Sequence, residues 1–120
     1  MGQSYDVTYS LKIKDRQKLI DAVNAYIDET NEKRIRWSLD DRDRNNLTDL
    51  MKIVITDRGF MQTEDEFYSC FDATYSWEWV MMEVFEVMSP YLEDGSSLEI
   101  YPDYGRDLLV IENDEVKVVE

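Results

Sequence analysis

The chain has no histidine, one cysteine, two prolines and four glycines among its 120 residues. The lack of histidine removes the commonest general base and metal ligand, and it excludes Ser-His-Asp and Cys-His nucleophile arrangements. A single cysteine allows neither an internal disulfide nor a structural zinc site built from Cys and His. The glycines are too scattered for a phosphate-binding loop or a dinucleotide motif. We therefore expect a protein that is not an enzyme and that holds no cofactor and no metal.

The lone thiol also bears on the compartment. An unpaired cysteine fits a reducing environment, and we expect Cys70 to be buried rather than reactive. The N-terminus is polar from Gly2 onward and lacks an apolar signal segment, and Glu83 and Glu86 interrupt the longest apolar run. The sequence therefore predicts a cytoplasmic protein that neither inserts into nor binds membranes.

Charge is distributed unevenly along the chain. The 13 basic and 27 acidic residues give a net charge of −14. Residues 1–58 hold 11 of each and are neutral, whereas residues 59–120 hold only Arg106 and Lys117 against 16 acids, so this half carries the whole −14. Such a surface repels nucleic acid and attracts basic proteins. The alternative is that the acidity serves solubility alone.

Hydrophobic periodicity predicts one α+β domain over residues 1–120. Apolar residues alternate from Tyr5 to Ile13, which predicts a strand with one wet face. Asp15 can cap a helix over residues 16–32. Residues 46–59 fit a strand or a helix, and Asn46 with Gly59 as start and stop signals favours the helix. A short strand at residues 35–39 is an option within an otherwise irregular, mixed-charge loop.

The second half is predicted to hold one helix and most of the strands. The strand segments are residues 66–74, 98–101, 107–112 and 116–119, with the last two joined across Asn113 and Asp114. The resulting order is β-α-α-β-α-β-β-β. It indicates an antiparallel or mixed sheet of about four to five strands with about three helices packed on it.

Residues 77–88 form the most apolar stretch and are predicted to be the central helix, capped by Ser76 and ended by Pro90. Its apolar arc is too wide for a surface helix, so we expect it in the core. Trp79 and Met82 fall on the opposite side, among glutamates. Either another element covers them, or they anchor a partner.

One nuclease-like pattern is present. Pro102-Asp103 followed by Glu115-x-Lys117 resembles the Pro-Asp...acid-x-Lys signature of restriction-endonuclease-like nucleases, in which the two acids would hold Mg²⁺ and the lysine would help to activate water. The match is loose, and it lies in the acidic half, where phosphates are repelled. An exposed hairpin is the favoured interpretation, and a Mg²⁺-dependent nuclease is the lesser alternative.

The leading hypothesis is a non-enzymatic binder whose carboxylates stand in for phosphates and occupy the nucleic-acid site of a basic enzyme. Exposed aromatic side chains would act as anchors. The predicted partner-binding residues are Glu64, Asp65, Glu66, Trp79, Glu93, Asp94, Glu99, Tyr101, Asp103, Tyr104, Asp107, Glu112, Asp114 and Glu115.

Residues 71–78 (FDATYSWE), 91–96 (YLEDGS) and 100–103 (IYPD) carry a resemblance. They are similar to a family of small acidic uncharacterised proteins of bacterial phages and integrating mobile elements. The resemblance implies a role in the contest between mobile DNA and host defence, such as an anti-CRISPR or anti-restriction inhibitor, and it implies no catalytic residue. An immunity protein against a basic nuclease toxin is physically similar. The alternative of another class is a structural module that dimerises through Trp79 and Met82.

Overall fold

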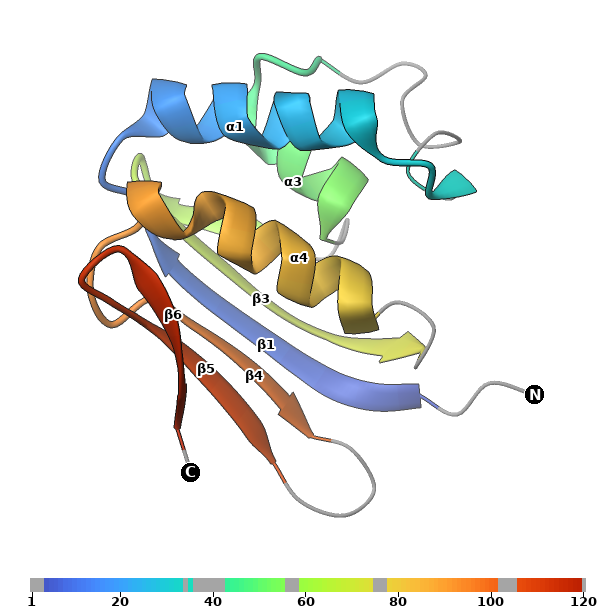
Figure 1. The fold of residues 1–120 in the computed structure, drawn as a ribbon, viewed down its shortest axis with the longest axis vertical. Helices are drawn as coiled ribbons and strands as arrows, with labels where there is room; N and C mark the ends of the chain where they lie inside the picture. The colour runs from blue at the N-terminus through green and yellow to red at the C-terminus, as the bar shows by residue number, and fades with distance from the viewer. Residues whose placement is uncertain are drawn as a thin grey trace.

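The protein folds as one antiparallel sheet with helices on one of its faces (Figure 1). The structure, a computed structural model, describes residues 4–33, 35, 43–55, 59–74, 78–101 and 106–119. In chain order the elements are β1 (Ser4–Lys12), α1 (Arg16–Glu29), α3 (Leu47–Val54), β2 (Phe60–Thr63), β3 (Glu66–Thr74), α4 (Glu78–Met88), the 3₁₀ turn η2 (Ser89–Tyr91), β4 (Ser97–Tyr101), β5 (Asp107–Glu112) and β6 (Glu115–Val119).

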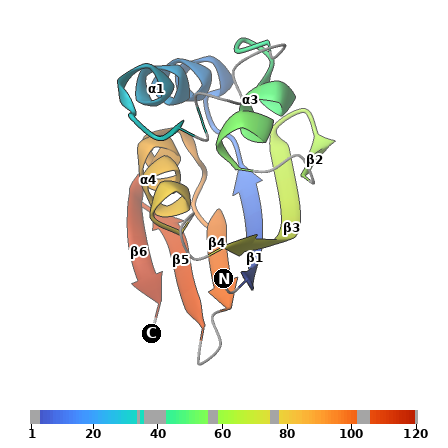
Figure 2. The ribbon, with the colours of Figure 1, turned by 90° about the vertical axis from the view of Figure 1, so that its right-hand side faces the viewer.

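The first strand lies in the middle of the sheet. The strand order is β2-β3-β1-β4-β5-β6, and each neighbouring pair is antiparallel (Figure 2). β1 therefore pairs with β3 on one side and with β4 on the other. This leaves β2 and β6 as the two edge strands.

The predicted α+β class is confirmed, and the described part of the chain has the three predicted helices. The prediction of four to five strands is wrong, because the sheet has six. The missed strand is β2, whose four residues are mostly exposed and show no alternation of polar and apolar side chains. Phe60, for example, is 52% exposed. A short edge strand needs little burial, so it leaves little periodicity in the sequence.

Several local predictions are confirmed in detail. The Asn46 side chain accepts the N–H of Asp49 at 3.1 Å, and residues 47–54 form a helix and not a strand. The predicted stop at Gly59 is wrong, because this helix already ends at its C-cap Ile55. Asn113 and Asp114 have φ of 54° and 64°, as a two-residue hairpin turn requires.

The first helix is shorter than predicted. α1 ends at Glu29, three residues before its predicted end at 32, because the chain becomes extended at its C-cap.

Some predictions fall on residues that the structure does not describe. The proposed cap at Ser76 and residue 77 lie outside the described ranges. Of the optional strand at residues 35–39 only Ile35 is described; it is buried and helical, so the strand prediction is wrong at this residue. Within the described ranges, no helix combines the length and apolar character needed to cross a bilayer.

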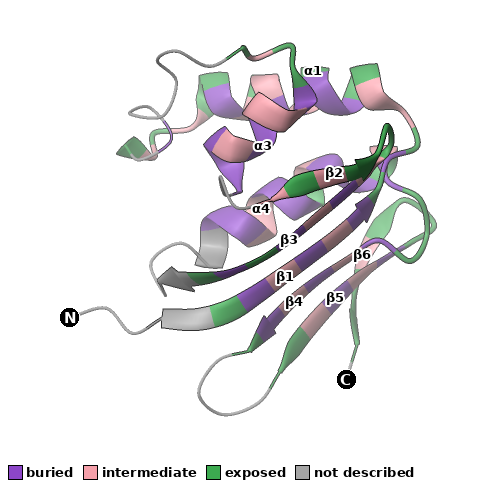
Figure 3. Ribbon diagram, turned by 180° about the vertical axis from the view of Figure 1, so that it is seen from behind, coloured by how far each residue is buried: buried purple, intermediate pink, exposed green. Residues whose placement is uncertain are grey.

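The core lies between the sheet and the three helices α1, α3 and α4, all of which contribute buried residues. On β1 the residues Val7, Tyr9 and Leu11 face the helices and are buried. The predicted burial of the central helix is confirmed for Val80, Met81, Val84, Phe85 and Met88. Figure 3 shows the opposite face of the sheet, and no described helix lies in front of it.

The two residues predicted to be either covered or partner-binding have different outcomes. Met82 is half-buried and packs against the core, which favours its structural interpretation. The side chain of Trp79 lies outside the described part of the chain. For Trp79, the alternatives of core and anchor residue therefore stay open.

Tyr9 joins the sheet to α4. Its ring is fully buried between Phe71 on β3, with centroids 6.5 Å apart and planes nearly parallel, and Phe85 on α4, in an edge contact at 6.2 Å. Its hydroxyl donates to the carbonyl of Met81 at 3.0 Å. A buried hydroxyl needs such a partner, so this bond fixes α4 relative to β1.

We expect Tyr9→Phe to lower the free energy of unfolding by about 1 kcal/mol, because it removes this buried hydrogen bond and keeps the ring contacts. Tyr68→Phe, on the face of the sheet away from the helices, is the matched control and should change stability by less than about 0.5 kcal/mol. Urea unfolding followed by circular dichroism measures both. Equal effects of the two variants would contradict this role for Tyr9.

Candidate functional site

Eight of the predicted partner-binding residues gather at one end of the sheet. They come from the β2–β3 turn, the start of β3, the turn before β4, the end of β5, the β5–β6 turn and the start of β6. We call this group the acidic rim, and its members are Glu64, Asp65, Glu66, Glu93, Asp94, Glu112, Asp114 and Glu115. All are exposed except Glu66, which is half-buried.

Backbone hydrogen bonds around the C-terminal end of β1 hold the rim together. The N–H of Ile13 donates to the carbonyl of Asp65 at 2.7 Å, and the N–H of Glu93 donates to the carbonyl of Lys12 at 2.8 Å. The carboxylate of Asp94 accepts the N–H of Asn113 at 3.1 Å, which ties the turn before β4 to the β5–β6 turn. The acidic turns are therefore fixed by main-chain hydrogen bonds and by the Asp94 carboxylate.

Four cations lie within the rim. Lys14 is hydrogen-bonded to Asp114, and Arg16 lies 4.0 Å from the carboxylate of Asp65. Lys117 is 3.2 Å from Glu115, and Lys12 pairs across the strands with Glu66. Four cations against eight carboxylates leave the rim with a net charge of −4.

The electrostatic effect of the rim is evident at Lys14. Its hydrogen bond to Asp114 raises the pKa of its ammonium group, and the charges of Asp114, Asp94 and Glu93 raise it further, against the opposing effect of desolvation. Carboxylates from two separate turns therefore act on one cation.

The other described members of the predicted set lie elsewhere. Tyr101 and Asp107 lie at the opposite ends of β4 and β5, and Glu99 lies in the middle of β4. All three are about 13 to 20 Å from the rim at roughly 3.3 Å per strand residue. There Glu99 accepts a hydrogen bond from the Tyr101 hydroxyl and lies 3.9 Å from Arg106. The hydrogen bond to Glu99 raises the pKa of Tyr101. The predicted residues therefore form two groups and not one continuous surface.

Sequence reasoning missed two acids beside this second group. Asp6 on β1 is directly opposite Asp72 on β3 and Tyr101 on β4. A hydrogen bond to Asp72 that only the protonated form can donate raises the pKa of Asp6, and repulsion between the two carboxylates adds to it. Only the pairing of strands distant in sequence brings these acids together, so no local pattern could reveal them.

Three predicted residues are not placed. Asp103 and Tyr104 lie outside the described residues, as does the Trp79 side chain. Of the nuclease-like pattern, only Glu115 and Lys117 are described, and they pair with each other. In the described ranges, no group of three or more Cys, Asp or Glu residues could hold a metal ion.

The prediction that Cys70 is buried is wrong, because its side chain is exposed. On β3 it shares the face away from the helices with Tyr68 and Asp72, while Phe67, Ser69 and Phe71 point into the core. Its sulfur accepts a hydrogen bond from the Thr8 hydroxyl at 3.6 Å. Alternation along β3 decides the outcome, because Phe71 takes the buried position next to it.

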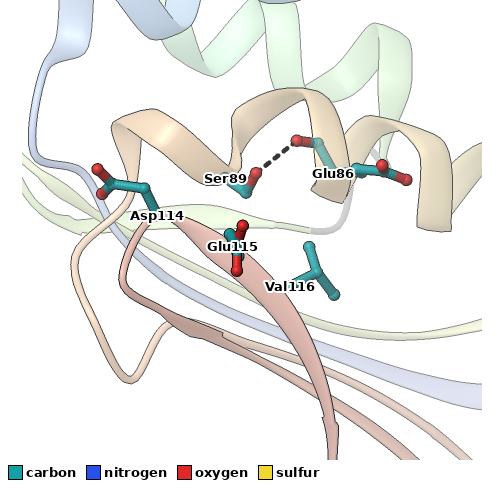
Figure 4. Close-up of a pocket in the computed structure, with 5 residues that line it drawn as sticks. All are labelled: Glu86, Ser89, Asp114, Glu115 and Val116. Atoms are coloured by element: carbon teal, nitrogen blue, oxygen red, sulfur yellow. Dashed lines mark hydrogen bonds between the residues drawn. The ribbon is translucent and has the colours of Figure 1, made fainter.

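An open groove adjoins the rim between α4 and β6. It has a volume of about 420 Å³ and is lined by Glu86, Ser89, Asp114, Glu115 and Val116 (Figure 4). The Ser89 hydroxyl donates to the carbonyl of Glu86 at 2.7 Å, so it is directed back at the helix. The groove therefore presents mainly carboxylates.

A second hollow continues along α4. It has a volume of about 330 Å³, is lined by Tyr26, Glu83, Glu86 and Val87, and shares Glu86 with the groove at β6. Burial raises the pKa of the Tyr26 hydroxyl, and the charge of Glu83 raises it further. The outer side of α4 is thus acidic along these two hollows.

No protein-family model, curated protein or solved structure shows significant similarity to the chain.

Asp72→Asn is expected to raise the melting temperature at pH 7 but not at pH 3. A carboxyl whose pKa is higher in the folded state binds its proton more tightly when folded, so stability is lost as the pH rises from the ordinary value of 3.8 through the raised value. Removing the Asp72 charge abolishes this loss. Thermal unfolding of the unchanged protein and of Asp72→Asn at pH 7 and pH 3 measures the difference in melting temperature. A stabilisation that is the same at pH 3 would show that repulsion between Asp6 and Asp72 is not its cause.

Proposed function

We propose that this protein is a non-enzymatic inhibitor that binds a basic, nucleic-acid-handling enzyme through the acidic rim. The observation that carries the proposal is the convergence of eight carboxylates from separate turns around the end of β1. If acidity served solubility alone, no such gathering would be needed, and the charges could be spread evenly over the surface. After its four cations are counted the rim keeps an excess of four negative charges, which a partner of opposite charge would neutralise.

The mechanism follows from electrostatics. A nucleic-acid enzyme lines its site with Lys and Arg, which hold phosphates and release counterions when nucleic acid binds. Carboxylates fixed by a hydrogen-bonded backbone can meet the same cations without the entropic cost of ordering a mobile chain. Steering by the rim would raise the rate of association, and the complex would weaken as salt screens the charges. Anti-CRISPR, anti-restriction and nuclease-immunity proteins would all use this mechanism, in which carboxylates occupy the cationic site of an enzyme.

The first experiment is an affinity pull-down of the tagged protein from a bacterial lysate at low salt and at about 0.5 M salt, with the retained proteins identified by mass spectrometry. The expected result is a basic nucleic-acid-binding enzyme that is retained at low salt, released at high salt and displaced by added DNA or RNA. Retention of the protein alone would favour a self-contained or dimeric structural module instead.

Charge reversal then tests whether the rim is the binding surface. Glu93→Lys with Glu112→Lys should slow association with the captured enzyme about tenfold or more and flatten its salt dependence. Neither residue makes a side-chain ion pair among the described residues, so the fold should persist.

The matched control is Asp21→Lys with Glu29→Lys on α1, which changes the net charge by the same amount away from the rim. Surface plasmon resonance at several salt concentrations compares the two double variants. If both slow association equally, total charge and not the rim governs binding, and the proposal in this form is refuted.

A further inference from the structure

The backbone of β6 has one row of hydrogen-bonding groups directed away from the sheet. Ile111 on β5 lies opposite Val116. The N–H of Ile111 donates to the carbonyl of Ser96 at 2.9 Å, and its carbonyl accepts the N–H of Gly95 at 3.0 Å, so both groups of Ile111 point away from β6. In an antiparallel pair, the residue opposite then has its own N–H and C=O directed outward.

The same orientation recurs two residues later. Antiparallel pairs alternate between bonded and non-bonded, so Val118, opposite Leu109, also directs its N–H and C=O outward. β6 is the edge of the sheet, and among the described residues no further strand pairs with it. The outer edge therefore offers a template at Val116 and Val118 for one more strand.

The side chains of β6 do little to block such pairing. Val118 is 68% exposed and Val119 is 42% exposed, and residues 115–119 contain no proline. The one cation of the strand, Lys117, is already paired with Glu115 at 3.2 Å. Exposed valines on a free edge favour strand addition by a segment with apolar side chains.

The groove beside β6 sets the charge of the segment that fits. A residue paired with Val116 on an added strand projects its side chain to the same face as Val116, toward α4. That space is the groove lined by Glu86, Asp114 and Glu115 (Figure 4). A lysine or arginine side chain would meet the carboxylate of Glu86 there, whereas those of Asp114 and Glu115 are already paired with Lys14 and Lys117. The residue two positions away on the added strand would lie next to Val118.

We propose that the outer edge of β6 binds an extended segment of a basic partner by strand addition, with a Lys or Arg side chain in the groove beside Glu86 and an apolar side chain against Val118. A second copy of the chain fits less well, because it would bring another net charge of −14 to the same place. Only the positive charge of the partner rests on the proposed function. The outward backbone groups of Val116 and Val118 do not depend on it.

The probe is a synthetic capped heptapeptide, Thr-Arg-Thr-Val-Thr-Arg-Thr, which presents Arg, Val and Arg on one face of a strand. It is titrated at low salt into the isotope-labelled protein and followed by NMR. We expect saturable shifts of the amides of Val116 and Val118, with a dissociation constant on the order of a millimolar. The same peptide with Glu in place of Arg is the matched control and should give no saturable shift.

Three variants separate the backbone and charge contributions. Val118→Pro removes the outward N–H without removing a bond to β5, and it should abolish saturable binding, whereas Val118→Thr keeps the N–H and should weaken binding by no more than about threefold. Glu86→Lys, at an exposed helix position, should weaken binding about tenfold. It keeps the proposal testable if the proline variant fails to fold.

Three results would overturn the proposal. The first is unchanged peptide binding by both Val118→Pro and Glu86→Lys. The second is a set of shifts confined to the acidic rim near Glu93 and Asp94, which would show simple charge attraction. The third is a concentration-dependent dimer of the protein alone in sedimentation, with shifts at β6, which would make a second copy the occupant. Each of these results can occur even if Glu93→Lys with Glu112→Lys slows association as expected. Strand addition at β6 can therefore be refuted while the proposed function of the rim stands.

Discussion

The buried hydroxyl of Tyr9 is the constraint on which the arrangement of the sheet depends. Its bond to the Met81 carbonyl and its contacts with Phe71 and Phe85 join the central strand, its neighbour and the helix that covers them. Once α4 lies on this face of β1, alternation sends every second residue of the sheet to the other face. Apart from Ser69, which is buried in the core, the polar and charged side chains of the described strand interiors then lie on that face.

The central position of β1 also explains why the acids gather. Because β1 pairs antiparallel with β3 and β4, its C-terminal end meets the start of both strands, and β5 returns to the same end. Acidic turns far apart in sequence are therefore brought to Lys12 and Lys14. Three of the four cations in the rim come from the neutral half of the chain. The uneven charge of the sequence is thus partly balanced in space, and the acidic half is not a separate polyanionic surface.

Sequence reasoning succeeds here where the deciding interactions are local. The alternation along β1, the Asn46 cap and the turn at Asn113 and Asp114 each involve residues within a few positions of one another. It fails where pairing between distant segments decides. The exposure of Cys70, the opposition of Asp6 and Asp72, and the gathering of the rim all follow from strand order and register, which one sequence does not specify. β2 was missed because a short edge strand buries too little to leave a pattern.

The two edges of the sheet differ in a way that connects the acidity to binding. At β2 the register with β3 shifts between Met61 and Thr63, and such an irregularity limits further pairing. At β6 no comparable feature interrupts the pairing with β5. What opposes self-association there is charge, since each copy brings −14. In the proposed complex the same charge would attract a basic segment, so acidity would keep copies apart while leaving the edge open to a partner. This protection holds only where charges are weakly screened, because at 1 M salt the screening length falls to about 3 Å.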